Sequence, residues 1–329
     1  MRPARHQFAS ILAQHMITYL VAQRALGKRM HTEEKTLRLL DRYLLDNHIH
    51  ELVDITPTVI DSFLMSRRRA TPCSYDALLT PVRRCFKWMV GQEVLPSSPV
   101  LATPRHPRRV LRPFIFCQHD MKRLLAAAAA LPSRSNAPER GRVYRIIFVL
   151  LYGLGLRVGE ACCLQHQDVD LDRQLLCIRQ GKFSKDRLVP FGPKIGEELR
   201  QFVNWRQTRS MCLPDSPVFT FRSDGSRPVY PYTVSTTFRN LMPQLNLTVP
   251  PGTRKPHLHC LRHSFAVGTL LRWYHAGIDP NSRLLHLSTF LGHVSPAATA
   301  VYLTITDDLL QVANRRFARF APSLSGVTP

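Results

Sequence analysis

The sequence predicts a mainly α protein with a small antiparallel β-sheet, in which an all-helical N-terminal domain precedes a mixed α+β region. Apolar residues recur at helical spacing along much of the chain, for example between residues 7 and 25. Two short apolar runs, residues 175–179 and 187–191, flank a polar turn and predict a β-hairpin. A Pro- and Arg-rich stretch without hydrophobic periodicity separates the two regions.

Four helices are predicted in the N-terminal domain, residues 1–100. The first covers residues 7–25 and the fourth residues 75–90. Thr32 is expected to cap the second helix, because two glutamates follow it where the helix dipole favours acidic groups. Thr56 followed by Pro57 predicts the start of the third helix.

Basic side chains are frequent on the last two of these helices. Any one of them reads as a solvated surface residue, but as a set they predict a face that follows phosphate groups. The set contains Arg67, Arg68, Arg69, Arg83, Arg84 and Lys87. Residues 101–113, which include Arg108 and Arg109, are predicted to form an extended basic linker.

The second region, residues 114–329, is predicted to be mostly helical. Residues 218–221 are a candidate third strand, and residues 192–217 receive no element. The predicted helices cover residues 117–130, 143–152, 157–164, 233–245, 261–275, 282–291, 296–303 and 307–320.

The composition indicates a polyanionic partner. The formal net charge is +22, and residues 1–112 hold 18 basic and 9 acidic groups, so both regions are positive. No run approaches the ~20 apolar residues that span a bilayer, and no signal peptide is recognised. The eight cysteines form no C-x-x-C pair, so we expect reduced thiols in a cytoplasmic protein.

Four segments of the second region carry side chains suited to chemistry at a phosphate. Each segment alone also has an ordinary structural interpretation: a surface arginine, a polar turn, a helix C-cap glycine or a core tyrosine. The first holds Arg157 in a G-L-R-x-x-E pattern; the second holds Lys182, Lys185 and Arg187 in the predicted hairpin; the third is H-x-L-R-H, with His259, Arg262 and His263; the fourth is L-G-H, with His293, followed nine positions later by Tyr302.

Together these motifs resemble the tyrosine recombinase (phage integrase) family, whose catalytic domain carries the same five motifs in the same order. The resemblance implies a tyrosine recombinase catalytic domain in residues 114–329 and a helical core-binding (SAM-like) domain in residues 1–100. Gly159 and Phe183 depart from the usual residues of the first two motifs, and neither departure removes a catalytic group.

The resemblance further implies a site-specific recombinase that cleaves and rejoins DNA through a 3′-phosphotyrosine intermediate, for integration, excision or transposition. Double-stranded DNA is then the partner, and the protein is expected to form a tetramer on two DNA sites in the nucleoid. Accessory DNA-bending proteins are compatible with this role. Neither ATP nor a metal ion is required, so no cofactor is expected.

The residue types fit this chemistry. Arg157 and Arg262 are suited to clamp one phosphate, because guanidinium is planar, bidentate and always charged. The phenol of Tyr302 has an ordinary pKa near ~10, so it needs a proton acceptor or a positive field, for which His259 and the arginines are candidates. Lys182 is a plausible proton donor to the leaving 5′ oxygen, and His293 a hydrogen-bond donor to the phosphate.

Several alternatives remain open. One alternative is a zinc site formed by His257, His259, Cys260 and His263. It is disfavoured because structural zinc sites usually pair ligands from two separated knuckles. A type IB topoisomerase shares the proposed chemistry, although the L-G-H motif and the small helical domain favour a recombinase. A catalytically silent DNA-binding accessory factor is the other alternative, and the complete set of six candidate catalytic groups argues against it.

The segment 307–320 carries apolar residues close to helical spacing and predicts an amphipathic helix. It packs either on its own catalytic domain or on a neighbouring subunit. The second arrangement would couple the four protomers that a tetramer needs, through head-to-tail contacts that close into a ring.

The positive charge on both sides of the linker predicts strongly salt-dependent DNA binding. The remaining DNA contacts are assigned to Arg67, Arg68, Arg83, Arg84, Lys87, Arg108, Arg109, Lys185 and Arg187. The slope of log affinity against log salt concentration should be steep, and smaller for residues 113–329 alone, because fewer counterions are released. Titrations at several salt concentrations measure it, and equal slopes for fragment and whole chain would exclude a clamp made by both regions.

Overall fold

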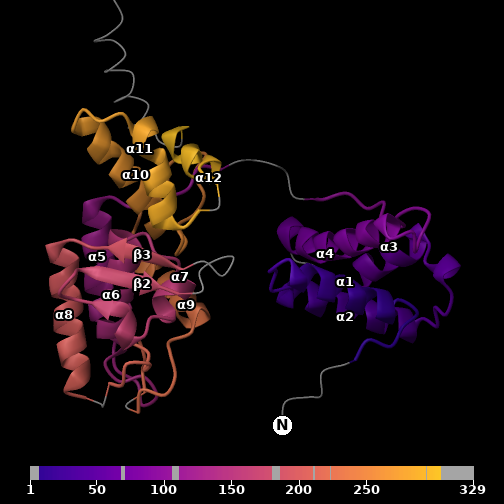
Figure 1. Ribbon diagram of the computed structural model, residues 1–329, viewed down its shortest axis with the longest axis horizontal. Coiled ribbons are helices and arrows are strands. Elements are labelled where there is room, and N and C mark those ends of the chain that lie inside the picture. The colour runs from indigo at the N-terminus through magenta and orange to yellow at the C-terminus, as the bar shows by residue number, and fades with distance from the viewer. Residues whose placement is uncertain are drawn as a thin grey trace, which may run out of the picture. The chain divides into compact units, whose positions relative to one another are not determined.

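The computed structural model describes residues 7–67, 71–105, 111–179, 186–209, 212–222, 224–293 and 295–304. The chain divides into two compact units, residues 1–109 and 110–329. Figure 1 labels their main helices and strands. No helix in the described ranges is long and apolar enough to cross a membrane. The predicted helix 307–320 lies outside the described residues.

The first unit contains four α-helices in its described residues. They are α1 (Ala13–Ala25), α2 (His31–Asp46), α3 (Pro57–Ser66) and α4 (Pro72–Gly91), with a short 3-10 helix at Leu52–Asp54. One apolar cluster joins them, and the fully buried side chains of Leu37, Phe63 and Phe86 belong to it.

Local sequence signals explain the helix starts of this unit unevenly. The predicted cap of α3 is confirmed, since the Thr56 hydroxyl accepts a hydrogen bond from the Val59 amide at 3.4 Å. The predicted cap of α2 is wrong: Met30 occupies the N-cap with a φ of 50° and offers no side-chain acceptor. Buried Asp41 of α2 instead accepts from the amide of Ser10 at 2.9 Å and so fixes the entry to α1.

The second unit is built around α6 (Arg140–Gly153), which is buried along nearly its whole length. Packed on α6 are α5 (Gln118–Ala129), α7 (Val158–Cys162), α8 (Pro193–Gln207) and α10 (Cys260–His275). Helix α9 (Pro231–Leu241) contacts α5 and α7, and Pro243 ends the predicted longer helix by starting a 3-10 turn, Pro243–Leu245.

The sheet is three-stranded and antiparallel, in the order β1 (Val169–Asp170), β2 (Leu175–Ile178) and β3 (Arg187–Pro190). The predicted pairing of residues 175–179 with 187–191 is confirmed, with Leu176 opposite Val189. The predicted third strand at 218–221 is wrong, because β1 takes that place. Val218 and Phe219 are both fully buried, and their backbone groups bond to Leu164 and Val229 in loops instead of joining the sheet.

Helix α8 was not predicted. Its signals are present: Gly192 before Pro193 starts it, and Leu199, Phe202 and Val203 form its buried face. Polar residues lie between these apolar positions, and a strand directly precedes the helix. Both features obscure the helical periodicity.

The last described elements gather at one end of the second unit, where α11 contacts β3 (Figure 1). They are α10, α11 (Pro280–Leu291), α12 (Ala297–Ala300) and the 3-10 helix η4 (Val301–Thr304). A separate small core holds them together, in which Leu270, Leu287, Leu291 and Tyr302 are buried. A tyrosine at the end of the described chain is thereby packed against α10.

We expect Gly141→Ala to destabilise the second unit. A Cβ atom at residue 141 would lie 2.6 Å from the carbonyl oxygen of Ala129 and 2.8 Å from that of Ala128, so α5 and α6 would have to separate. Such overpacking costs about 1–3 kcal/mol, which chemical denaturation would measure. Gly268→Ala in α10 is the matched control: a Cβ there meets nothing within 4 Å, so stability should stay the same or rise by up to ~1 kcal/mol. Equal effects of the two substitutions would contradict this account.

Candidate active site

Arg157 is positioned by the turn between α6 and α7. Gly155 allows this turn, because its φ is +60° and a Cβ there would lie 2.6 Å from Phe265. Arg157 is the N-cap of α7, and its amide donates to Glu160 Oε2 at 2.9 Å. Its guanidinium Nη1 also donates to Glu160 Oε1 at 2.6 Å. The G-L-R-x-x-E pattern thus folds into a capping turn that binds its own arginine twice.

Glu160 also binds Arg187 from β3. Arg187 donates from Nη1 and Nη2 to the two carboxylate oxygens at 3.0 and 2.8 Å. The side chain of Glu160 is only 6% exposed and that of Arg187 only 11%. Burial opposes ionisation of Glu160, but the hydrogen bonds and charge of Arg187, with the hydrogen bonds of Arg157, outweigh it and lower its pKa to about 2. One carboxylate therefore ties the predicted lysine hairpin to Arg157.

The end of α11 is held by three arginines. Its last carbonyl groups carry the negative end of the helix dipole, which guanidinium groups neutralise. The three hydrogen bonds run from Arg187 Nε to the Phe290 carbonyl at 2.9 Å, from Arg262 Nη2 to that of Leu291 at 2.6 Å, and from Arg157 Nη2 to that of Gly292 at 2.8 Å. This arrangement, hereafter the arginine clamp, joins all four segments found in the sequence, because the carbonyls of Leu291 and Gly292 belong to the fourth.

Gly292 is required at the end of α11 for two reasons. Its φ of +66° is the left-handed C-cap conformation. A Cβ there would also lie 2.9 Å from Arg187 Nη1. The next residue, His293, lies beside the clamp, and its Nδ1 is 2.7 Å from the Thr299 hydroxyl. Burial and the charges of Arg262 and Arg157 lower the pKa of His293 to about 4, so the imidazole is neutral at pH 7.

Arg262 is the most deeply buried member of the site, with 1% exposure. Its Nη1 donates to the carbonyl of Gly155 at 2.6 Å, so the first and third motifs are in direct contact. Burial and the nearby charge of Arg157 lower its pKa to about 10. Its Nε has no hydrogen-bond partner within the described part of the chain.

Tyr302 lies under this cluster on η4 and is 4% exposed. Its hydroxyl is 2.9 Å from Nδ1 of His263, a residue that the sequence interpretation gave no role. Burial raises the pKa of Tyr302, and the charges of Arg262 and Arg157 oppose that rise. The ring of His293 stacks near it at a centroid distance of 6.4 Å. The role of His263 follows from its contact with Tyr302. The spacing of the motifs in the sequence does not reveal that contact.

His259 does not hydrogen-bond to Tyr302 in the described structure. Its ring meets that of His263 edge-on, with centroids 4.7 Å apart. Partial desolvation and the charges of Arg262, His257 and Arg157 lower the pKa of His259 to about 4, although the residue keeps an exposed surface.

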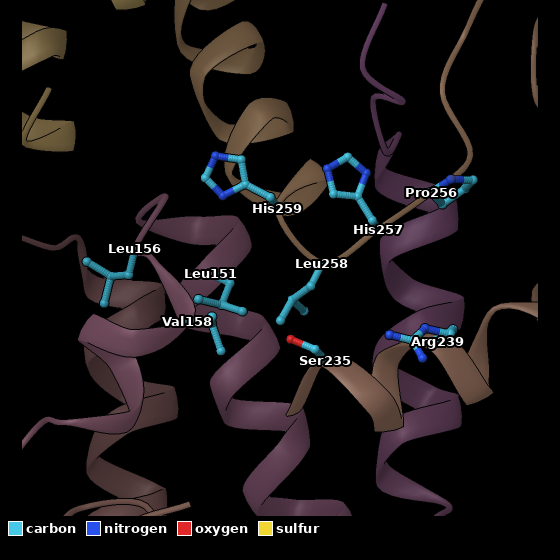
Figure 2. A pocket seen from close by; sticks show the side chains of 9 residues that line it. All are labelled: Leu151, Leu156, Val158, Ser235, Arg239, Pro256, His257, Leu258 and His259. Atoms are coloured by element: carbon cyan, nitrogen blue, oxygen red, sulfur yellow. The ribbon is translucent and has the colours of Figure 1, made fainter. Parts of the chain in front are cut away.

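A cavity of about 280 Å³ opens beside His259. Figure 2 shows His259 and His257 at one side of it and Ser235 and Arg239 of α9 at the other, over a floor that includes Leu151. Two imidazoles and a guanidinium beside an apolar floor suit an anionic group next to the arginines. Nowhere in the described ranges are three His, Cys, Asp or Glu side chains grouped to hold a metal ion.

The residues predicted to contact DNA lie in different settings. Arg84 and Lys87 are exposed on α4, Arg67 follows α3 half-buried, and Arg83 donates to the carbonyl of Ala102. Arg187 is largely buried, and its guanidinium is engaged by Glu160 and the end of α11, so this geometry gives it an internal role in place of the predicted DNA contact. Lys182, Lys185, Arg68, Arg108 and Arg109 lie outside the described residues.

Known proteins resemble this chain in sequence and in fold. Residues 116–308 match the phage integrase family. The integrase/recombinase y4rB of Sinorhizobium fredii is 33% identical over 94% of this chain and 98% of its own length. Tyrosine recombinase XerA of Thermococcus kodakarensis is 30% identical over 69% of each chain. The Tn1549 transposon integrase, solved in complex with a circular intermediate DNA, has the same fold, with a TM-score of 0.64 at 14% identity over 93% of this chain and 99% of that one.

A mostly helical unit with a small antiparallel sheet is thus the fold of the Tn1549 transposon integrase and of lambda integrase. The chain belongs to the phage integrase family, the tyrosine recombinases. Its relatives carry the names integrase, recombinase and tyrosine recombinase. They support neither the topoisomerase alternative nor the silent accessory factor.

Glu160→Gln should destabilise the second unit by about 3–5 kcal/mol, because it leaves two largely buried guanidinium groups without their anion. The pKa of Glu160 is depressed, so its contribution to stability is present above the ordinary carboxyl range and is lost as the pH falls toward 2. The wild type should therefore lose this stability between about pH 4.5 and 2. Denaturation at pH 7 and at low pH measures both effects.

Glu197→Gln on α8 is the matched control, since Glu197 forms an exposed pair with Arg200. It should change stability by less than about 1 kcal/mol. The role given to Glu160 is wrong if the two variants are equally stable at pH 7.

Proposed function

We propose that this chain is a site-specific recombinase that cleaves one DNA strand by attack of Tyr302 and rejoins it to another. The observation that carries the proposal is the convergence of Arg157, His259, Arg262 and His293 around the buried phenol of Tyr302. These residues come from four separate motifs, and no structural need of a helical core explains so many cationic and imidazole groups together.

Arg157 and Arg262 are proposed to bind the nonbridging oxygens of the scissile phosphate. Both already bind backbone carbonyl oxygens at the end of α11, so their guanidinium planes are fixed before DNA arrives. Preorganised donors stabilise the charge of the transition state without a reorganisation cost. Arg157 keeps 24% of its side chain exposed and is the more accessible of the two. His259 and His293, neutral and next to the arginines, are suited to donate further hydrogen bonds to the same phosphate.

The leaving 5′ oxygen needs a proton, and Lys182 is the proposed donor. Residues 180–185 join β2 to β3, and β3 is fixed to the site through Arg187 and Glu160. The hairpin is therefore anchored where its turn leaves the sheet. The phosphotyrosine keeps the energy of the cleaved bond, so rejoining needs no ATP.

Cleavage requires Tyr302 to leave its covered position. At 4% exposure its hydroxyl is inaccessible to a phosphodiester. η4 is a short 3-10 turn that packs on α10 and α12. We propose that DNA binding displaces η4 enough to bring the phenol to the phosphate held by Arg157 and Arg262.

The first unit is proposed to be the core-binding domain, with the exposed Arg84 and Lys87 of α4 among its DNA contacts. The charge of +22 supports a second large contact with phosphates. Recombination of two duplexes also requires several protomers, and a tetramer on two sites, with the segment 307–320 as its linking helix, is the proposed assembly. The Tn1549 transposon integrase and lambda integrase were both solved with DNA, which supports this partner.

The decisive experiment traps the covalent intermediate. A nicked suicide substrate that carries the recombination site should give a protein–DNA adduct with the wild type. Tyr302→Phe should bind the same DNA with unchanged affinity and give none, because it lacks the attacking oxygen. Tyr274→Phe, on the last turns of α10, is a control that should form the adduct normally. An adduct in Tyr302→Phe would disprove the assignment, and relaxation of supercoils lacking the site would favour a topoisomerase.

A further inference from the structure

The contact between Tyr302 and His263 carries an inference beyond the six groups proposed above. The Tyr302 hydroxyl oxygen and His263 Nδ1 are 2.9 Å apart, a normal hydrogen bond. The two rings lie 5.5 Å apart at 57°. His263 follows Arg262 directly on the first turn of α10, so the residue after a phosphate-binding arginine holds the nucleophile.

The protonation state of His263, in one of its two tautomers, lets this hydrogen bond run from the phenol to the imidazole. Burial is the main cause that lowers the pKa of His263, to about 3, and the charges around it act the same way. The groups that face it are His257, His259 and Arg254 from the preceding loop, Arg262 from α10 and Tyr302 from η4. At neutral pH the imidazole is therefore uncharged. In the tautomer that carries its proton on Nε2, Nδ1 offers a lone pair and the phenol donates to it.

The two histidines of the H-x-L-R-H motif are divided between two tasks. His259 is exposed and lines the cavity shown in Figure 2, where a phosphate can reach it. His263 bonds the phenol, and its edge-on contact with His259 restrains its ring. The nearest proton acceptor to the nucleophile is thus the second histidine, and not the first.

On the basis of the proposed recombinase function, we propose that His263 is the general base that takes the proton of Tyr302. As the Tyr302 oxygen forms its bond to phosphorus, the bond from phosphorus to the 5′ oxygen breaks. The phenolic proton passes to His263 Nδ1, and the 5′ oxygen receives a proton from the separate acid. In rejoining, the 5′-hydroxyl attacks phosphorus and returns its proton to the separate acid, while the Tyr302 oxygen leaves and regains its proton from the His263 imidazolium. A bound phosphate stabilises that imidazolium, since its negative charge offsets the neighbouring arginines.

The test measures single-turnover cleavage of a suicide substrate against pH. The substrate carries sulfur in place of the bridging 5′ oxygen, so that departure of the leaving group needs no proton donor. His263→Asn keeps a hydrogen-bond acceptor near the phenol but cannot take a proton. It should cleave about a hundredfold more slowly than the wild type near neutral pH, within the usual range for a general base.

The pH profile separates catalysis from structure. The wild-type rate should change little between about pH 6 and 8.5, because neutral His263 is present throughout. The rate of His263→Asn should rise about tenfold per pH unit, as the ionised fraction of the phenol rises below its pKa. His263→Phe keeps an aromatic ring at this position but removes the proton acceptor. It should show the same slope of log rate against pH as His263→Asn.

Controls keep the outcomes distinct. His275→Asn makes the same change in the exposed last turn of α10 and should cleave within about twofold of the wild type. DNA affinity and melting temperature report whether each variant is folded. A wild-type rate for His263→Asn, a slow rate with a flat profile, or faster cleavage through release of a stored tyrosine would each overturn the proposal. Absence of any adduct with the wild-type protein would instead refute the recombinase function itself.

Discussion

The arginine clamp at the end of α11 is the interaction on which the candidate site depends. Three guanidinium groups bind three successive carbonyls, and Glu160 binds two of the three arginines. The helix dipole and one carboxylate together offset much of the repulsion among these cations. Because each arginine comes from a different motif, the clamp also brings together segments that lie more than 130 positions apart.

The positive field of the clamp determines the state of the groups around it. It adds to burial in lowering the pKa values of His259, His263 and His293, so the imidazoles are neutral at pH 7. Neutral imidazoles both donate to a phosphate and accept a proton, which a cluster of charged histidines cannot do. For Tyr302 the same field acts against burial and favours the phenolate. The site is therefore electrostatically prepared for an anion before DNA is present.

Burial of Tyr302 adds a constraint on when the chemistry occurs. The phenol belongs to the small core of α10, α11 and η4, and its hydroxyl is paired with His263. Both features keep the phenol covered. In the proposed mechanism, DNA binding must therefore supply the free energy that exposes Tyr302.

The sequence by itself determined the helix-rich class, the hairpin β2–β3 and the motif residues from Arg157 to Tyr302, because periodicity and spacing are local properties of the chain. The sequence wrongly predicted a strand at residues 218–221, because a run of buried apolar residues there has the pattern of a buried strand. It also did not predict α8, whose apolar face is narrow. Only the tertiary structure decided that Arg187 faces Glu160 and that His263 holds the phenol. The first contact joins residues 27 positions apart and the second joins residues 39 positions apart. No local pattern specifies which side chains will meet across such separations.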